Sequence, residues 1–335
     1  MKDQEKLKLI ISMIVEATAN NGDESVSGNE QTIKKIKVGN RYYSVISIPK
    51  FKRILQDHLV ENRRDLFEHP QVVFDKGVAQ RVPTNTNPKA DVLLSFLGYM
   101  CTDSSKSGSG KTLVRKSALD VMFIRSITPY QYDSLLHNNN GLIRSSGIQM
   151  EHQGSNLYKR EYHVSLYPIH IVLHLDSLFR NDLNDNLNVQ QFTPEYMTDC
   201  VLAMLEELHI GISDTSLGIH NTLSPLYFHA FLSRVGRNNA KVWAYDVVDD
   251  FGGLHVNILD YWRAFIDNAI IRTDKEGKKI FGYLYHTRHV RIDEKDKSIF
   301  LHCASSGNSA WDTFANDLRN KLTEFFTNAK NGIIN

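Results

Sequence analysis

The order of apolar and polar positions along the chain predicts a mixture of strands and helices. The first strand is predicted by an apolar run close to the start of the sequence. Two shorter strands follow, because the turn-forming pair Gly39 and Asn40 divides the next apolar stretch. Later segments alternate apolar and polar residues with the period of a strand. The predicted strands are residues 7–15, 33–37, 42–47, 161–179 and 227–234.

Three helices are predicted from apolar side chains spaced three and four residues apart. The first begins at Pro49, since proline is favoured in the first turn of a helix. The second follows Thr193 and Pro194, and the third begins at about Ser309. The predicted buried stripes are Phe51, Ile54, Leu55, His58 and Leu59 in the first helix, Met197, Val201, Met204, Leu205 and Leu208 in the second, and Trp311, Phe314, Leu318, Leu322 and Phe325 in the third.

Three segments between these elements are rich in turn residues. Residues 62–89 contain three prolines and a polar run, so we expect an insertion that projects from the core. Residues 137–158 are polar and too long for a tight turn, which predicts a projecting loop or hairpin. Residues 210–225 are small, polar and glycine-bearing, and they are a second candidate for such a hairpin.

Charge is segregated in this chain, although its net charge is only +1. Residues 31–53 carry seven lysines and arginines and no acid, and three of the cations fall in the first turn of the predicted helix. A helix start favours anions, so a phosphate that docked there would stabilise the helix. We therefore hypothesise that this stretch holds a nucleic-acid backbone. A solvated basic face is the alternative.

A second basic segment spans residues 104–132, which hold five cations and a single acid, Asp120. We expect its middle part to form one strand with Arg115, Ser117, Leu119 and Val121 on one face, which leaves Lys116 and Arg125 for other surfaces.

Composition narrows the protein class. No apolar run approaches the roughly 18 to 20 residues that a membrane-spanning helix needs. The N-terminus mimics a secretory signal, but Asp3, Glu5 and Glu16 favour a strand there instead. The three cysteines are widely separated, so we expect neither a disulfide framework nor a metal cluster, and a cytoplasmic protein.

Candidate catalytic and metal motifs are weak. Gly110, Lys111 and Thr112 match only the end of a phosphate-binding loop, because Ser105 stands where the first glycine is required and the following residues alternate like a strand. We therefore expect a flexible loop there and no nucleotide site.

Two further clusters could suggest metal chemistry. His163, His170 and His174 lie on the strand at 161–179, and we expect them to be structural or surface residues. Asp246, Asp249 and Asp250 precede two glycines, which favours a solvated loop. No metal and no cofactor is expected.

Three pieces of the sequence, in this order, resemble a known family. They are SGNEQTIKKIKV followed by YSVISIPKFKRIL, then ADVLLSFLGYM followed by LVRKSALDVMF, then YKREYHVSLYPIHIVLHLD with the helix at 195–208. Together they resemble the backbone subunit of type I CRISPR interference (Cascade) complexes, in its DevR-like branch. Leu97, Lys116 and Ala118 depart from that pattern, where the family has phenylalanine, arginine and proline.

The resemblance implies an α+β fold with a modified RRM/ferredoxin-like palm, a finger-like insertion and a thumb hairpin. Residues 1–60 and 110–335 would form the palm with its thumb, and residues 61–109 the finger. We favour residues 210–225 for the thumb and keep 137–158 as the runner-up.

The resemblance also implies a non-catalytic, cytoplasmic subunit. Several copies would oligomerise along a guide RNA (crRNA), with other Cascade subunits, and present it for pairing with target DNA. Such subunits hold the RNA backbone, while base pairing selects the sequence. The residues that would contact RNA are Asn29, Lys34, Lys35, Lys37, Ser47, Lys50, Lys52 and Arg53, with Arg115, Lys116, Ser117 and Arg125 beside them.

Two other functions stay open at this point. An RNA-cleaving or RNA-processing enzyme with an RRM-like fold could use a loop acid, for which Asp23 is the candidate. An α+β enzyme could instead use the basic stretch to bind a phosphorylated small molecule.

Overall fold

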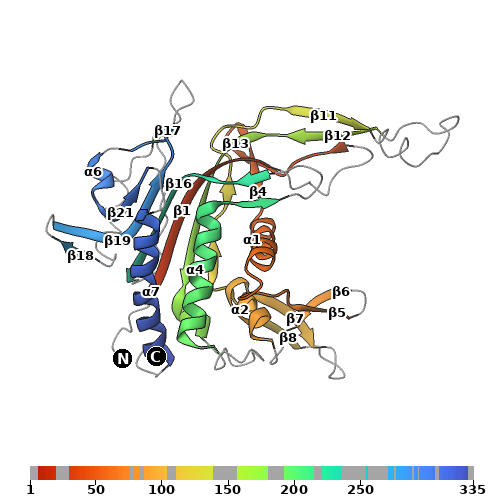
Figure 1. Ribbon diagram of the computed structural model, residues 1–335. Coiled ribbons are helices and arrows are strands. Elements are labelled where there is room, and N and C mark those ends of the chain that lie inside the picture. Colours follow the sequence, from red (N-terminus) through yellow and green to blue (C-terminus); the bar gives the residue numbers. More distant parts are fainter. Residues whose placement is uncertain are drawn as a thin grey trace, which may run out of the picture.

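The computed structural model describes residues 7–19, 30–75, 78–82, 87–103, 111–138, 157–179, 192–214, 221–234, 254–255, 271–274, 277–288, 290–292, 294–305 and 309–330. Within these ranges, helices pack against a seven-stranded sheet from which smaller hairpins project (Figure 1). None of the helices in these ranges is long and apolar enough to cross a membrane.

Six elements form the palm, a four-stranded antiparallel sheet with two helices. Its strands lie in the order β16-β1-β13-β9. In chain order the elements alternate as strand, helix, strand, strand, helix, strand, which is the ferredoxin-like arrangement of RRM domains. The predicted α+β class with an RRM-like palm is therefore confirmed. The elements are β1 (Leu7–Thr18), α1 (Ile48–Asn62), β9 (Leu119–Val121), β13 (Val164–His174), α4 (Pro194–Ile210) and β16 (Pro225–Arg234).

The sheet continues past β16 into the C-terminal part of the chain. β19 pairs with β16, and β18 and β21 pair with β19. The helix α7 (Ser309–Lys330) packs beside α4, and its predicted apolar stripe is buried. The other elements of this part are β17 (Leu254–His255), β18 (Ile271–Asp274), β19 (Gly277–His286), β20 (Val290–Arg291), α6 (Glu294–Lys297) and β21 (Phe300–Ala304).

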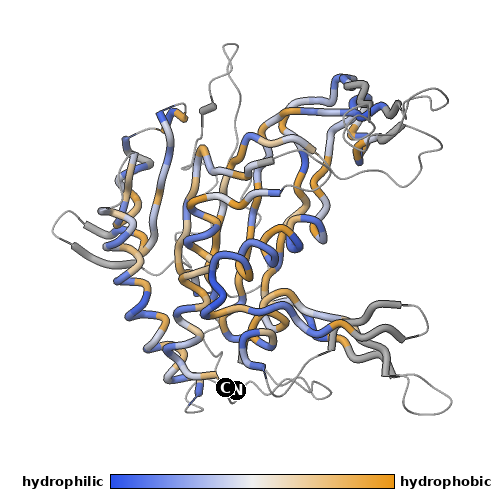
Figure 2. Tube along the Cα trace, turned by 45° about the vertical axis from the view of Figure 1, so that its right-hand side comes forward, coloured by the Kyte–Doolittle hydropathy of each residue, from blue (hydrophilic) through white to orange (hydrophobic). Residues whose placement is uncertain are grey.

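β1 is buried on both of its faces, which explains why its sequence is a continuous apolar run. Leu9 and Met13 belong to the core beneath the helices, whereas Ile10 and Ile14 belong to a second core with residues of β16 and β19. A strand that is covered on both sides does not alternate apolar with polar residues. Apolar residues accordingly concentrate along the central strands (Figure 2).

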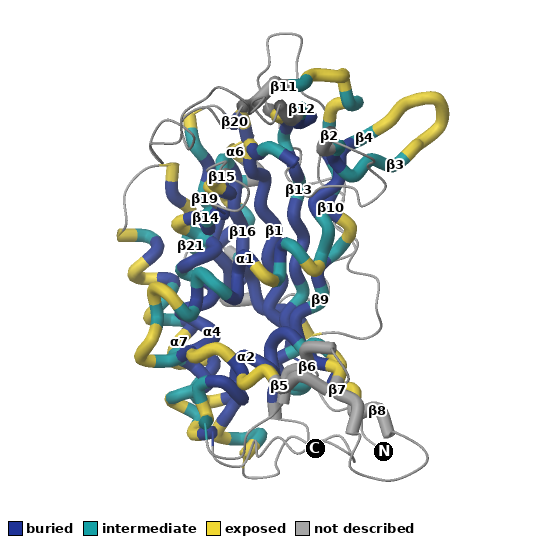
Figure 3. The backbone as a smooth tube through the Cα atoms, turned by 90° about the vertical axis from the view of Figure 1, so that its right-hand side faces the viewer, coloured by how far each residue is buried: buried dark blue, intermediate teal, exposed yellow. Residues whose placement is uncertain are grey.

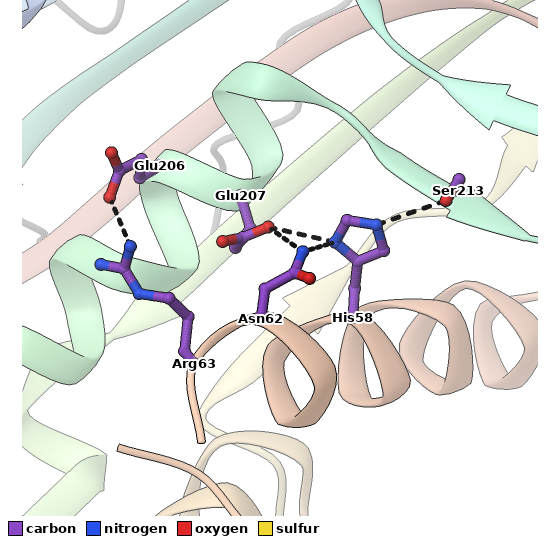
Figure 4. A network of polar contacts seen from close by, with 6 residues as sticks. All are labelled: His58, Asn62, Arg63, Glu206, Glu207 and Ser213. Carbon is purple, nitrogen blue, oxygen red and sulfur yellow. Dashed lines mark hydrogen bonds and ion pairs between the residues drawn. The ribbon is translucent and has the colours of Figure 1, made fainter. Parts of the chain in front are cut away.

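Helix α1 lies where the sequence predicts it, with Phe51, Ile54, Leu55 and Leu59 buried. Its polar contacts fix it against α4 (Figure 4). Glu207 Oε2 of α4 lies 3.1 Å from His58 Nδ1 and accepts a hydrogen bond of 3.0 Å from Asn62. Arg63 donates to Glu206 at 3.0 Å, and Ser213 Oγ lies 3.4 Å from His58 Nε2. These contacts hold the helix that carries the basic first turn.

A hairpin rich in cations leads into α1. β3 (Lys35–Val38) and β4 (Arg41–Ile46) pair around Gly39 and Asn40, and Gly39 has the positive φ of 59° that this turn requires. β10 (Ile124–Arg125) extends the sheet beside β4. The exposed turn of the hairpin extends away from the palm (Figure 3). Both predicted strands are confirmed.

Two more hairpins correspond to the segments rich in turn residues. β11 (Asp133–Asn138) pairs with β12 (Leu157–Tyr162), which also pairs with β2 (Glu30–Gln31). β14 (Ile212–Asp214) pairs with β15 (Asn221–Leu223) immediately after α4. These strand pairs agree with the hairpins predicted there. Residues 139–156 and 215–220, which connect the paired strands, lie outside the described residues.

The described part of the insertion between α1 and β9 forms two hairpins, β5–β6 and β7–β8, and one helix, and the hairpins project from the palm (Figure 1). Helix α2 is buried from Ala90 to Leu97 and contacts the 3-10 helix η2 (Leu175–Phe179), so it anchors the insertion to the palm. The remaining elements are β5 (Gln71–Asp75), β6 (Val78–Val82), α2 (Pro88–Leu97), β7 (Tyr99–Asp103) and β8 (Lys111–Arg115).

The expectation of a single strand through Arg115, Ser117, Leu119 and Val121 is wrong. β8 pairs with β7 in the projecting hairpin, whereas β9 pairs with β13 in the palm, so the chain changes sheets at residues 116–118. The backbone passes Gly98 closely at this point. A Cβ on Gly98, which has a φ of 73°, would lie 2.7 Å from the carbonyl oxygen of Arg115.

Candidate nucleic-acid interface

The first turn of α1 has the features of an anion site. Ser47 is the N-cap, but its side chain makes no capping hydrogen bond, and no acid lies in the first turn. Lys50 and Lys52 are half-buried, and the Arg53 side chain is 58% exposed while it pairs with Asp57 at 2.7 Å. Cations stand here at the positive end of the helix dipole, which an external anion would neutralise.

Lys50 joins this turn to the hairpin that follows α4. Its Nζ lies 2.8 Å from Asp214 Oδ2 at the end of β14, and the Asp214 side chain is buried. The hairpin β14–β15, which contains the favoured thumb position, is thus anchored next to the start of α1. The ion pair also orients the Lys50 ammonium group, whose three donors allow more than one partner.

Lys52 joins the same turn to the second basic segment. Its Nζ donates to Ser117 Oγ at 2.7 Å, and the Ser117 hydroxyl lies 2.9 Å from the carbonyl oxygen of Phe96. Burial lowers the pKa of Lys52, while the nearby Asp120 opposes that shift. Lys116, beside Ser117, is exposed. We call Ser47, Lys50, Lys52, Arg53, Lys116 and Ser117 the α1 cluster.

Arg115 lies apart from this cluster, inside the protein. The residue is only 4% exposed, and its guanidinium donates to Ser95 Oγ at 2.9 Å and to the carbonyl oxygen of Ser177 at 3.3 Å. These bonds join β8 to α2 and η2. Because its guanidinium is engaged inside the protein, we do not include Arg115 in the proposed interface.

The predicted residues in and beside the β3–β4 hairpin form a second group, the hairpin cluster of Lys34, Lys35, Lys37 and, on β10, Arg125. Lys35 Nζ lies 2.7 Å from Glu161 Oε2 and 4.5 Å from the centre of the Tyr130 ring. The Arg125 guanidinium lies 5.1 Å from the centre of the Tyr43 ring. Lys37 is exposed and Lys34 half-buried. Asn29 lies outside the described residues.

Sequence reasoning missed the partners of these cations. Asp214 and Glu161 are far away in sequence and carry no motif that links them to Lys50 and Lys35. It also missed the tyrosines that accompany the hairpin cluster, although the pair Tyr42-Tyr43 inside a basic stretch was a visible signal.

The histidines of β12–β13 have structural partners. His163 Nδ1 lies 2.6 Å from Ser44 Oγ, His170 Nδ1 lies 2.9 Å from Ser12 Oγ, and His174 Nε2 lies 2.9 Å from Asp120 Oδ2. Among the described residues, no group of three or more His, Cys, Asp or Glu side chains could hold a metal ion. Asp23 and the acids at residues 246–250 lie outside those residues.

A cavity of about 520 Å³ between α4 and α7 does not resemble a phosphate pocket. Its lining includes Asp199, Glu206 and Asp312, and its two arginines pair with acids, Arg63 with Glu206 and Arg319 with Asp199. A phosphorylated ligand would meet carboxylates there. This cavity therefore does not favour the alternative of an enzyme that binds a phosphorylated small molecule.

The family is decided by a match to residues 9–226 of a family model described as "CRISPR-associated negative auto-regulator DevR/Csa2". This chain belongs to the DevR/Csa2 family. The match covers the palm up to the start of β16, so the family expected from the sequence is confirmed. No curated protein matches this DevR/Csa2 chain.

A solved structure shares the fold of this DevR/Csa2 protein. A chain of a "CRISPR RNA-guided surveillance complex, pre-nicking" superposes with a TM-score of 0.57 at 12% identity, covering 93% of this chain and 100% of that one. A chain of a "CRISPR RNA-guided surveillance complex" gives a TM-score of 0.46 at 11% identity, covering 92% and 99%. At these identities the first match shows a common fold.

Proposed function

We propose that this DevR/Csa2-family protein is a non-catalytic subunit of a type I CRISPR interference (Cascade) complex that binds the sugar-phosphate backbone of a guide RNA. Several copies oligomerise along the RNA, assemble with other Cascade subunits and present the guide for pairing with target DNA. The family, and the fold shared with a chain of an RNA-guided surveillance complex, support this setting.

One observation carries the proposal. The two basic segments, predicted separately to touch RNA, meet where Lys52 donates to Ser117 at 2.7 Å. This contact brings exposed Lys116 next to the first turn of α1, so cations from both segments line one surface. A single exposed lysine can lie anywhere on a protein surface. Cations from two segments that meet at a helix N-terminus fit a phosphate site.

Two acids orient cations of the α1 cluster. Asp214 pairs with Lys50 and Asp57 pairs with Arg53, and each negative charge reduces the repulsion between the two cations. The exposed pair of Arg53 with Asp57 contributes only about 0–1 kcal/mol, so a phosphate can share Arg53 at small cost. Asp214 is buried, so Lys50 keeps this partner and offers a phosphate its other donors. The cluster therefore stays ordered without RNA and remains able to bind it.

The number of cations predicts how binding responds to salt. The α1 and hairpin clusters together hold eight cations, which are Lys34, Lys35, Lys37, Lys50, Lys52, Arg53, Lys116 and Arg125. If about seven cations neutralise phosphates, the slope of log K against log salt is about −5 for a single strand, at about −0.7 per contact.

The parts of the fold take the corresponding roles in this proposal. The RRM-like sheet with α1 and α4 is the palm. The insertion with β5 to β8 is the finger, which therefore extends beyond the expected boundary at residue 109 to include β8. The hairpin β14–β15 is the thumb, supported by its anchorage to Lys50 beside the α1 cluster. The hairpin β11–β12 is the runner-up.

The test begins with the purified full-length chain. The proposal predicts co-purifying RNA of some tens of nucleotides, and binding of added single-stranded RNA after this RNA is removed. Lys50→Glu with Arg53→Glu should weaken binding to every RNA sequence alike and make the salt slope shallower by about 1.4, because two contacts of about 0.7 are lost.

Two comparisons make this test specific. Lys50→Glu places a second acid beside Asp214, so Arg53→Glu with Lys116→Glu is tested as well, since both side chains are exposed. Lys297→Glu with Lys321→Glu, on α6 and α7, changes the net charge equally and should leave binding within about twofold. Equal loss in this control, a sequence-selective loss, or cleavage of target RNA abolished by Asp23→Ala would each contradict the proposal.

A further inference from the structure

A group of tyrosines and lysines lies where the β3–β4 hairpin meets β12. We call Tyr42, Tyr130 and Tyr132, with Lys35, Lys37 and Lys159, the tyrosine ledge. Tyr42 is 51% exposed and Tyr132 is 58% exposed. Lys35 Nζ lies 4.5 Å from the centre of the Tyr130 ring, and Lys159 Nζ lies 5.0 Å from the centre of the Tyr132 ring.

The ledge is continuous across three segments of the chain. The backbone N–H of Tyr130 donates to the carbonyl oxygen of Tyr42 at 2.7 Å, and Lys37 is the cross-strand partner of Tyr42. Tyr132 follows Tyr130 by two residues. At about 3.3 Å per extended residue and about 5 Å between strands, the backbones of Tyr42 and Tyr132 lie within roughly 12 Å of each other.

The charge of the ledge is positive. Three lysines accompany the rings, against Glu161 and the exposed Asp133. Glu161 is held inward, since its Oε2 accepts from Lys35 Nζ at 2.7 Å and from the backbone N–H of Ile33 at 3.0 Å. The exposed rings are therefore flanked mainly by cations.

Exposed aromatic rings that alternate with lysines suit a single-stranded nucleic acid. Its bases are free to stack on side-chain rings, while lysines meet the neighbouring phosphates. Tyrosine is also common at protein interfaces, but lysine is depleted there, and each ring of the ledge has a lysine as its neighbour. The lysines therefore favour a nucleic acid over a protein partner.

We propose that Tyr42 and Tyr132 stack on unpaired bases of a single-stranded RNA whose phosphates the α1 and hairpin clusters hold. This inference rests on the proposed function and adds contacts to bases, which backbone binding alone does not include. β4 connects the two regions directly, because Tyr42 precedes Ser47 by five residues, or about 17 Å of extended chain.

The test separates bases from phosphates. The full-length chain, freed of bound RNA, is titrated with a fluorescein-labelled single-stranded RNA and with a matched strand in which the bases are replaced by abasic units. Wild type should bind the base-bearing strand at least about tenfold more tightly. Tyr42→Ala with Tyr132→Ala should remove that preference and leave affinity for the abasic strand unchanged.

Substitutions at both positions serve as controls. Tyr42→Phe with Tyr132→Phe keeps the rings and should bind as wild type does. Met100→Ala, at an exposed position of β7 in the insertion, should have no effect. A 2-aminopurine base in the RNA should be quenched by wild type and by the phenylalanine variant, and quenched less by the alanine variant, because stacking on an aromatic ring changes its fluorescence.

Three other outcomes would each contradict a different part of the proposal. If wild type binds both strands equally and the alanine variant matches it, backbone binding stands and stacking is wrong. If the alanine variant binds RNA normally but no longer associates with other copies, the ledge is a protein interface. If wild type binds neither strand, the proposed function itself fails, and the inference fails with it.

Discussion

His170 and His229 are buried on either side of Ser12 in the palm sheet, and we expect them to make the protein sensitive to acid. Both are the cross-strand partners of Ser12, one on β13 and the other on β16. His170 is 6% exposed and His229 is fully buried. Burial lowers the pKa of His170 to about 4 and that of His229 to about 3, and the proximity of His170 adds to the second shift.

The sign and size of the effect follow from these values. In the unfolded chain both imidazoles titrate near 6.5, so between pH 6.5 and about 4 the unfolded state binds more protons than the native state. Well above pH 6.5 the two histidines therefore cost the native state no stability, and the free energy of unfolding falls as the pH is lowered through 6.5. At pH 5.5, one unit below 6.5, each histidine costs about 1.4 kcal/mol, or about 3 kcal/mol together.

Urea unfolding at pH 7.5 and pH 5.5 measures this loss. With an m-value of about 3 kcal/mol/M, His170 and His229 should account for about 1 M urea of the fall in the wild-type midpoint. His170→Gln with His229→Gln keeps hydrogen-bonding side chains that do not titrate, so its midpoint should change much less between the two pH values. His209, whose pKa burial lowers to about 4, remains in both proteins and cancels in the comparison.

A destabilised control is needed, because any core substitution lowers the midpoint. Leu322→Ala removes buried apolar volume from α7 without changing a titrating group, so it should lower the midpoint equally at both pH values. The reasoning is refuted if the glutamine variant loses as much stability between pH 7.5 and 5.5 as wild type does, or if the Leu322→Ala variant loses the pH dependence.

Two further predictions concern the supports of the interface. Gly98→Ala should lower stability by more than about 2 kcal/mol, because the positive φ of Gly98 and the backbone 2.7 Å away both oppose a Cβ. Gly39 has a similar φ of 59° but open space around it, so Gly39→Ala should lower stability by only about 1 kcal/mol. Thermal unfolding measures both losses. Glu207→Ala removes the buried acceptor shared with α1 and should cost about 1–3 kcal/mol, whereas Glu206→Ala breaks a half-exposed pair and should cost under about 1 kcal/mol in urea unfolding. Equal losses within either pair would contradict the reasoning.

Local patterns in the sequence determined the elements that are set by nearby residues. The apolar run of β1 and the helical spacing of α1, α4 and α7 each predicted the element that forms. The turn at Gly39 and Asn40 was also predicted, since it depends on the conformational freedom of those residues. The order of the family motifs then indicated how these elements assemble.

Contacts between distant residues could not be predicted in this way. Lys52 and Ser117 are 65 positions apart, and Lys35 and Glu161 are 126 positions apart. Such pairs depend on the strand order of the sheet and on where the chain leaves it. Arg115 illustrates the limit: a cation in a basic segment suggests a surface residue, yet its guanidinium is buried against α2 and η2.

The sequence by itself therefore determined which segments fold as strands or helices and which of them carry cations. Only the tertiary structure decided which cations share a surface, which acids orient them and which tyrosines lie beside them. The physical reason is range: backbone preference and apolar spacing act over a few neighbouring residues, whereas a charged surface is assembled from strands that meet through the packing of the palm.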